Sequence, residues 1–210
     1  MDYSNFFINR PTAEIAKDLL GRTLSYNNGS EILSGTIVEA EAYVGPKDRA
    51  AHSYAGHRSP ANEGLYGPGG TLYIYAQRQY FFFDVATQEK DNGQGVLIRA
   101  IDPISGIDTM IKNRHGKDGI LLTNGPAKLM QAFGVTSRKW DCHPIAESPF
   151  DIDLSSKKKI KKIAAVPRIG INQSDPVWAK KPLRFIVSGN PYVSDIKKKD
   201  VDSDFGFDKN

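Results

Sequence analysis

Apolar positions in the first 43 residues follow helical spacing and then strand spacing. Residues 9–20 place apolar side chains three and four apart behind a Pro-Thr start, and Gly21 follows them, which predicts an amphipathic helix closed by glycine. Strand-like runs at 23–26 and 32–43 flank Asn28-Gly29, a strong signal for a β-hairpin. The chain is therefore predicted to open with a helix and an antiparallel pair of strands.

Residues 45–70 lose this periodicity and are rich in Gly, Pro, His, Arg and Ser. A loop of this length in a compact domain is usually functional or disordered, because it buries little apolar surface to offset its ordering entropy. We expect it to form a wall of a functional site. Aromatic strand material at 71–86 and a strand at 96–100 then continue the hairpin architecture.

Helical patterns occupy the middle of the chain, at 105–113 and 127–133, and strand patterns return at 163–171 and 183–187. Strands, then helices, then strands, without regular βαβ alternation, predict an α+β fold. The expected architecture is a single domain in which helices surround a curved antiparallel β-sheet.

Length and composition fit one globular domain. The chain has 210 residues, of which 40% are hydrophobic and 25% charged, and a chain of this size is expected to build a single core. We expect the domain to span residues 1–195. Residues 196–210 are charged and hold few apolar positions, which predicts a mobile tail.

The sequence lacks the motifs of disulfide-rich, metal-binding, nucleotide-binding and membrane-spanning proteins. A single cysteine, Cys142, excludes an intrachain disulfide framework and a cysteine-rich zinc site. Nucleotide-loop and metalloprotease motifs do not occur, so no cofactor and no metal is expected. No segment approaches the roughly 20 apolar residues that span a bilayer, which predicts a cytoplasmic protein without a membrane partner.

The net charge of +4 permits nucleic acid as a partner without selecting it. Five lysines fall among residues 157–162, a run that fits a solvated loop or strand as well as a phosphate contact. Four Asp lie at 200–208, and without them the chain would carry +8. The body of the protein is therefore more basic than the whole chain.

Two carboxylates are expected on one face of the strand around residues 37–43. With a side-chain period of two, Glu39, Glu41 and Tyr43 point to the same side, and the two Glu Cα atoms lie about 6.6 Å apart. In a dry site one charge would raise the pKa of the other carboxyl. An ordinary half-exposed strand with a hydrated acidic face shows the same alternation, so both interpretations stay open.

Aromatic side chains follow these carboxylates along the chain. Tyr43 continues the acidic face, His52 lies in the long loop, and Tyr73 and Tyr75 share one strand face. Such rings can stack on a base extruded from a duplex, and plain core packing explains the tyrosines as well.

Arg99 ends the apolar run at 96–98, where an exposed position would be unusual. A guanidinium near a core needs a partner, and Glu41 is the candidate. A structural ion pair explains this arrangement as well as catalysis does.

Together these motifs resemble the signature of the alkyladenine (3-methyladenine) DNA glycosylase family, bacterial type. The blocks, in the order of that family, are IVEAEAYVGPKDRAAHS at 37–53, RSPAN at 58–62, GTLYIY at 70–75, VLIRA at 96–100, GPAKL at 125–129, RIGI at 168–171 and KPLRF at 181–185. The resemblance covers roughly residues 10–195. It implies a monomeric, monofunctional DNA glycosylase that hydrolyses the N-glycosidic bond of flipped-out alkylated or deaminated purines in base-excision repair. The implied partner is double-stranded DNA containing damaged purines, met at the bacterial nucleoid.

The resemblance also implies roles for individual residues. Glu41 is similar to the general base that deprotonates the water attacking C1′, and Arg99 with the backbone carbonyl near Ile169 would hold that water. Tyr43 would stack on one side of the extruded purine, with His52 and Tyr75 on the other side.

Two positions depart from the pattern of the family. Where it usually carries a wedging Tyr-Gly pair, this chain has Ala76-Gln77-Arg78-Gln79. The gap left by the flipped nucleotide could be filled by Arg78, through stacking of its guanidinium, or by a different loop. Asp84 stands where the family usually has Asn. An ionised aspartate only accepts hydrogen bonds, which predicts a damage preference shifted toward positively charged alkylpurines.

Two other functions stay open at this point. One is a non-catalytic damaged-DNA-binding module of the same fold, because the altered wedge loop could prevent productive flipping. The other is a sugar-processing hydrolase that uses Glu39 and Glu41 as paired acids, although this would leave the ordered blocks unexplained.

Overall fold

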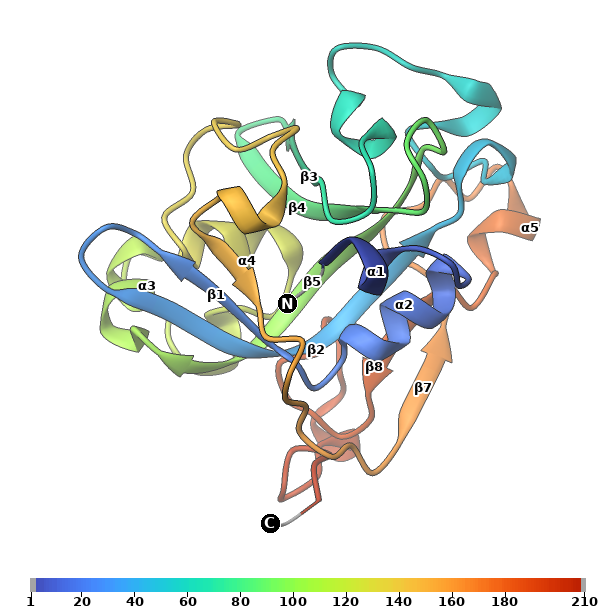
Figure 1. Cartoon of the computed structure of the whole chain (residues 1–210). Coiled ribbons are helices and arrows are strands. Elements are labelled where there is room, and N and C mark those ends of the chain that lie inside the picture. The colour runs from blue at the N-terminus through green and yellow to red at the C-terminus, as the bar shows by residue number, and fades with distance from the viewer. Residues whose placement is uncertain (1–2, 209–210) are drawn as a thin grey trace.

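An eight-stranded antiparallel sheet forms the body of the protein in the computed structural model, which describes residues 3–208 (Figure 1). The main path of paired strands is β3 (Leu72–Gln77), β4 (Tyr80–Thr87), β5 (Gln94–Ser105), β2 (Ile32–Tyr43), β1 (Thr23–Asn27) and β6 (Phe150–Ile152). Two short strands, β7 (Ile163–Val166) and β8 (Arg184–Val187), add a branch, because β8 pairs with both β7 and β2.

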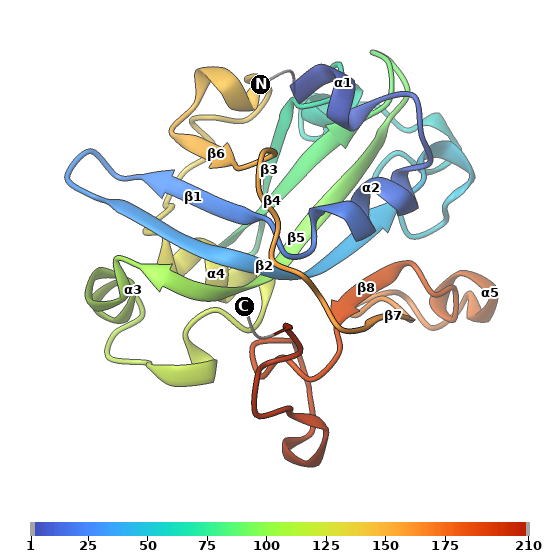
Figure 2. The same cartoon turned by 60° about the horizontal axis from the view of Figure 1, so that its bottom comes forward.

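The sheet bends and branches along β2, one of its two longest strands. The first half of β2 pairs with β1, whereas residues 39–41 pair with β8 on the same edge. Register shifts around Glu39 mark irregular pairing with β5, and such bulges increase the local twist of a sheet. The curved antiparallel sheet and the α+β class predicted from the sequence are confirmed (Figure 2).

Short helices cover this sheet and join its strands. They are α1 (Tyr3–Phe7), α2 (Thr12–Leu19), α3 (Ile107–Asn113), α4 (Pro126–Ala132) and α5 (Pro176–Ala179). α2 packs against β2 and β5 with a buried face that includes Ile15 and Leu19, as its spacing predicts. Gly21 follows it with a φ of 84°, a conformation that favours glycine. Among residues 3–208 no helix is long and apolar enough to cross a bilayer.

The strand predicted at 163–171 is shorter than expected. β7 ends at Val166, because Pro167 cannot donate to a strand ladder and Gly170 has a φ of 77°. Residues 167–171 instead form a loop beside the sheet. This loop supplies side chains and backbone groups to the site described below.

Residues 196–208 pack against the body of the protein, although the sequence predicts a mobile tail there. The Phe207 ring is 9% exposed and belongs to the core, and its backbone bridges Ile160. The lysine run supplies the complementary charge, since Lys161 pairs with Asp204 and Lys159 with Asp208. The few apolar residues of this charged segment, Phe207 and the partly buried Ile196, attach it to the core, which its overall composition did not indicate.

Candidate active site

A cavity of about 290 Å³ opens beside strands β3, β4 and β5, where three loops and the start of α4 meet. The residues that line it are Tyr43, Ala50, His52, Leu65, Tyr73, Tyr75, Gln77, Phe82, Asp84, Leu97, Arg99, Pro126, Ile169, Gly170 and Ile171. Apolar and aromatic walls with a few polar groups are typical of a site for a small organic group.

The register of the sheet aligns the polar groups of this site. Tyr73 is paired with Asp84, Asp84 with Leu97, and Leu97 with Glu41. Side chains directly opposite one another on neighbouring strands point to the same face of a sheet. Tyr73, Asp84, Leu97 and Glu41 therefore form one transverse row on the face that carries the cavity.

Glu41 is fully buried, and two hydrogen-bond donors and one guanidinium hold its carboxylate. Oε1 accepts the backbone N–H of Ile169 at 2.8 Å and lies 3.3 Å from Nη1 of Arg99. Oε2 accepts the Tyr43 hydroxyl at 2.9 Å. Burial raises the pKa of Glu41, and Arg99, the Ile169 N–H and the Tyr43 hydroxyl oppose that rise. The alternative of a hydrated acidic strand face is wrong, because both Glu39 and Glu41 have no exposed surface.

Arg99 joins the two glutamates, so the predicted contact with Glu41 is confirmed. Its Nε donates to Oε1 of Glu39 at 2.8 Å, and its side chain is only 7% exposed. Glu39 also accepts hydrogen bonds from Arg184 at 3.0 Å and from the backbone N–H of Ser194 at 2.7 Å. Glu39 is thus saturated by structural partners, whereas Glu41 lies next to the cavity-lining residues Tyr43 and Ile169.

Aromatic rings form the walls of the cavity, as the sequence predicts. Tyr73 and Tyr75 stack at 4.9 Å, and the His52 ring meets Tyr75 edge-on at 4.8 Å. Nδ1 of His52 and the Tyr73 hydroxyl share a hydrogen bond of 2.7 Å. Burial lowers the pKa of His52, which favours the neutral ring. Tyr43 is packed beneath the Arg168 guanidinium, 4.6 Å from its ring centre.

Asp84 lies in the floor of the cavity with 4% of its surface exposed. Among the residues that the structure describes, none offers a hydrogen bond to its Oδ1. Burial and the neighbouring Glu41 raise the pKa of Asp84 well above its usual range, and Arg99 opposes them.

Two predicted site residues are not among those that line the cavity: Glu41, which lies behind its neighbours Tyr43 and Ile169, and Arg78. Arg78 is the more distant of the two. It is exposed in the turn between β3 and β4, with a φ of 56°. Gln77, just before it, is among the lining residues. The turn therefore lies at the rim, and the wedge role of Arg78 stays a prediction.

A second buried ion pair was not predicted from the sequence. Arg168 makes two contacts with Asp48, Nη1 to Oδ2 at 2.6 Å and Nη2 to Oδ1 at 2.8 Å, and neither side chain is exposed. This pair ties the start of the 45–70 loop to the 167–171 loop, which holds the N–H of Ile169 against Glu41. Asp48 and Arg168 lie within the blocks at 37–53 and 168–171 that carry the family resemblance, and their opposite charges are the signal that could have paired them.

Within residues 3–208 no three His, Cys, Asp or Glu side chains are placed to hold a metal ion. The groups described above can act chemically in this site. These are a buried carboxylate, a guanidinium and stacked rings.

The profile of the methylpurine-DNA glycosylase family matches residues 6–191. The chain belongs to this family. The expected class of enzyme, a hydrolase of N-glycosyl bonds that acts on DNA, is thereby confirmed.

Relatives within this group extend over the whole chain. A protein of Lactobacillus johnsonii is 74% identical over 207 residues, which cover 99% of this chain and 100% of that protein. A protein of Lactobacillus helveticus is 65% identical over 209 residues, with the same coverage, and one of Enterococcus faecalis is 42% identical over 204 residues, which cover 97% of this chain and 88% of that protein. Each is named as a candidate 3-methyladenine DNA glycosylase.

Proposed function

We propose that this glycosylase is monofunctional and removes alkylated or deaminated purines of the 3-methyladenine class in base-excision repair. The observation that carries the proposal is the placement of Glu41. Its buried carboxylate is held by Arg99, Tyr43 and the Ile169 N–H directly behind an aromatic cavity.

The chemistry of base removal fits this carboxylate. Hydrolysis of a glycosidic bond passes through an oxocarbenium-like state, so a carboxylate near C1′ can stabilise positive charge and activate water. Arg99 supports the ionised form that a base requires, because it opposes the burial that raises the pKa of Glu41. None of the residues lining the cavity is a lysine, which supports water rather than an amine as the nucleophile.

The aromatic walls fit an extruded purine. In this proposal Tyr43 stacks on one face of the base, and His52 and Tyr75 contact the other. Damaged purines pair poorly or are better leaving groups, so extrusion and cleavage both cost less for them than for normal bases.

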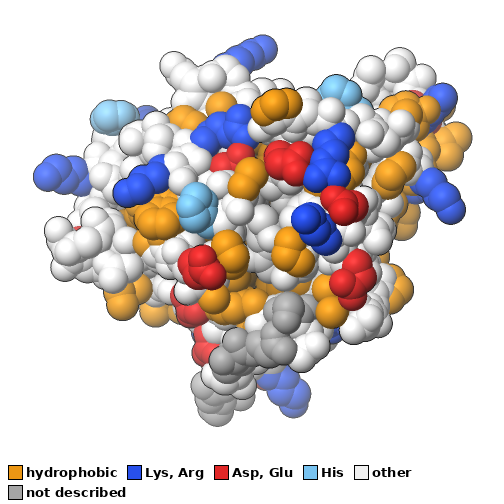
Figure 3. All heavy atoms as spheres, turned by 45° about the horizontal axis from the view of Figure 1, so that its top comes forward, with side chains coloured by type: hydrophobic (Ala, Val, Ile, Leu, Met, Phe, Trp, Pro, Cys, Tyr) orange, Lys and Arg blue, Asp and Glu red, His pale blue; other side chains and the backbone are white. Residues whose placement is uncertain are grey.

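The partner in this proposal is double-stranded DNA containing damaged purines, bound by a monomer in the cytoplasm near the nucleoid. The face in Figure 3 carries Lys and Arg side chains interspersed with Asp and Glu rather than one continuous basic patch. A net charge of +4 with this pattern supports weak, salt-sensitive attraction to phosphates. Such attraction suits a protein that searches DNA and then releases it.

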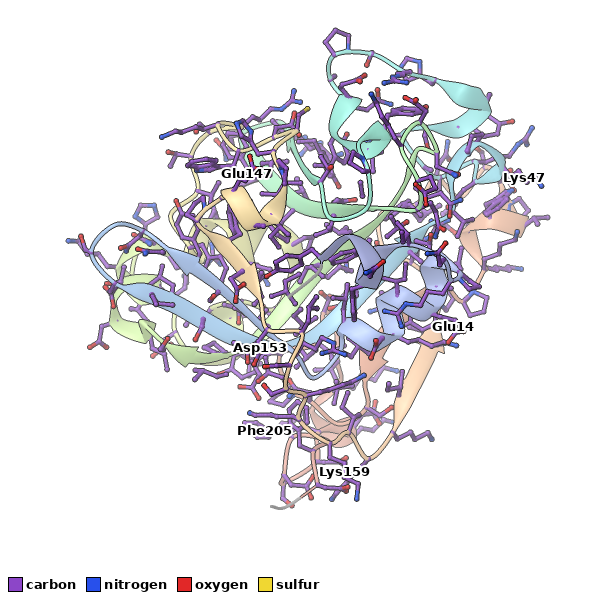
Figure 4. All side chains as sticks on the ribbon, viewed as in Figure 1. Glu14, Lys47, Glu147, Asp153, Lys159 and Phe205 are labelled. Carbon is purple, nitrogen blue, oxygen red and sulfur yellow. The ribbon has the colours of Figure 1, made fainter. Side chains whose placement is uncertain are left out.

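The test is release of free base from a methylated duplex by the wild type and by Glu41→Gln, with a gel-shift measurement on the same duplex. Glu14→Gln is the matched control, because Glu14 lies exposed on α2 and pairs with Lys17 at the surface (Figure 4). We expect loss of about two or more orders of magnitude in release by Glu41→Gln, retained DNA binding, and no change in Glu14→Gln. Binding by the wild type without release would instead select a non-catalytic damaged-DNA-binding module, and neither binding nor release would select a sugar-processing hydrolase.

A further inference from the structure

Asp84 combines three features that set it apart from the other carboxyl groups of the site. It projects from β4 into the transverse row that also holds Glu41, it is 4% exposed, and it lines the cavity. Its Oδ1 finds no hydrogen-bond donor within residues 3–208. A buried carboxylate with a free oxygen is costly unless something neutralises it.

The charges around the site balance without Asp84. Arg99 contacts Glu39 and Glu41, and Arg184 contacts Glu39, which gives two cations for two glutamates. Arg168 is committed to Asp48 by its two contacts. An ionised Asp84 would therefore add an unpaired negative charge to a buried cluster, whereas a protonated Asp84 leaves the cluster neutral.

We infer that Asp84 is an uncharged carboxylic acid in the free protein and acts as a specificity-determining residue of the site. It offers the edge of a bound purine a hydrogen-bond donor as well as an acceptor, and it gives up its proton when the purine is cationic. The expectation that this aspartate only accepts hydrogen bonds is thereby replaced. The inference rests on the proposed function, since it concerns the base that the cavity accepts.

The other titratable groups that face Asp84 keep their charge when a purine binds, so Asp84 is the group whose charge changes. Burial raises the pKa of Tyr73, Tyr75 and Tyr43 well above the usual range, so these hydroxyls keep their protons. Burial lowers the pKa of His52, which favours its neutral ring. Glu41 has two hydrogen-bond donors and a guanidinium, whereas Asp84 has no donor at Oδ1, so of the two carboxyl groups Asp84 is the one that keeps a proton.

The proton balance differs between two classes of purine. A cationic N-alkylpurine brings a positive charge, and Asp84 releases one proton to solvent as it binds. When the C1′–N bond breaks, its electron pair stays with the base, which becomes neutral, while the water oxygen bonds to C1′ and gives a proton to Glu41. Asp84 then takes a proton back from solvent. A neutral purine leaves with negative charge developing on the ring, which the O–H of Asp84 stabilises by a hydrogen bond until the released purine takes a proton from solvent.

The protonation state is measured directly by carbon-13 NMR of aspartate-labelled protein. The Asp84 carboxyl is assigned through its backbone correlations and confirmed by its loss in Asp84→Asn. Asp48, which is equally buried but paired with Arg168, provides the reference signal. We expect the chemical shift of a neutral carboxyl for Asp84 at about pH 7, whereas the shift of a carboxylate there would overturn the inference.

Selectivity is measured as the ratio of kcat/KM for 3-methyladenine over hypoxanthine in duplexes, between about pH 6 and about pH 8. The need for ionised Glu41 is common to both bases and cancels in the ratio. Because one proton is released only for the cationic base, the ratio should rise up to about tenfold per pH unit in the wild type. In Asp84→Asn, which cannot titrate, it should stay within about twofold.

A flat ratio in the wild type, or no release of hypoxanthine at any pH, would overturn the role of Asp84 in specificity. If the wild type releases neither base, the proposed function fails. The NMR measurement then still decides whether Asp84 is protonated, so the two failures are distinguishable.

Discussion

Glu41 and Asp84 occupy the same transverse row of the sheet, with Leu97 of the intervening strand between them. Two strand spacings place their Cα atoms about 10 Å apart. The Glu41 carboxylate is held by two hydrogen-bond donors and a guanidinium, whereas Asp84 has a free oxygen, so burial acts on the two groups unequally. Titratable pairs whose surroundings drive their pKa values apart are typical of sites that need a base and an acid together.

Asp84→Asn should make the free energy of unfolding fall less steeply as the pH rises. A carboxyl whose pKa is raised on folding binds its proton more tightly in the folded state, so its contribution is full below the unfolded pKa, about 3.9, and is lost as pH rises toward the folded pKa. The wild type should lose up to ~1.4 kcal/mol per pH unit in that window. The free energy of unfolding, measured with urea between about pH 5 and about pH 8, should therefore increase for Asp84→Asn relative to the wild type as the pH rises.

The control for that measurement is Asp118→Asn, because Asp118 is exposed on a loop. Its difference from the wild type should not vary with pH. A difference for Asp84→Asn that is equally constant would contradict the predicted linkage.

Tyr43→Phe should shift the acid limb of the pH profile for base release to higher pH. The Tyr43 hydroxyl donates to Oε2 of Glu41 and lowers the pKa of that carboxyl, so its removal should raise the midpoint by about one pH unit. Release at alkaline pH should be retained, since the stacking ring remains. Tyr26→Phe, a site in the aromatic core beside Phe133, should leave the profile in place.

Arg99→Met should destabilise the fold far more than Arg184→Met. Loss of Arg99 leaves Glu41 without its cation in a buried cluster, which costs about 3–5 kcal/mol. After loss of Arg184, Glu39 keeps Arg99 and the Ser194 N–H. Urea unfolding measures the free energy of unfolding of the two variants. Equal losses of that free energy would show that the ion pair between Arg99 and Glu41 contributes nothing to stability.

Arg78→Ala tests the predicted wedge. If Arg78 fills the gap left by an extruded nucleotide, the variant should release base more slowly from a duplex but normally from a single strand, where no gap forms. Arg78→Lys keeps the attraction to phosphates and separates charge from stacking. Unchanged excision by Arg78→Ala from duplex DNA would remove the wedge hypothesis.

Local patterns in the sequence predicted much of the fold, because periodicity reports which face of an element is buried. The Asn28-Gly29 turn joins β1 and β2 as predicted, and Gly134 follows α4 with a φ of 74°. The contact of Arg99 with Glu41 was also predictable, since an apolar run that ends in arginine demands a partner.

Contacts between distant segments could not be derived in this way. Asp48 and Arg168 are 120 residues apart, and Glu39 meets the Ser194 N–H across 155 residues. Spacing along a chain carries no information on which remote loops meet. The protonation state of Asp84 likewise depends on whether a nearby cation is free to pair with it. The tertiary structure shows that Arg99 and Arg184 are already engaged by Glu41 and Glu39.

The transverse row has a consequence for how this enzyme acquires activity during refolding. Glu41 and Asp84 are aligned only when β5 has joined both β4, its neighbour in a hairpin, and β2, from which residues 44–93 separate it along the chain. Pairings of high contact order form slowly. Recovery of base release should therefore lag behind recovery of helical signal, and a chain that has docked only some of its strands should be inert.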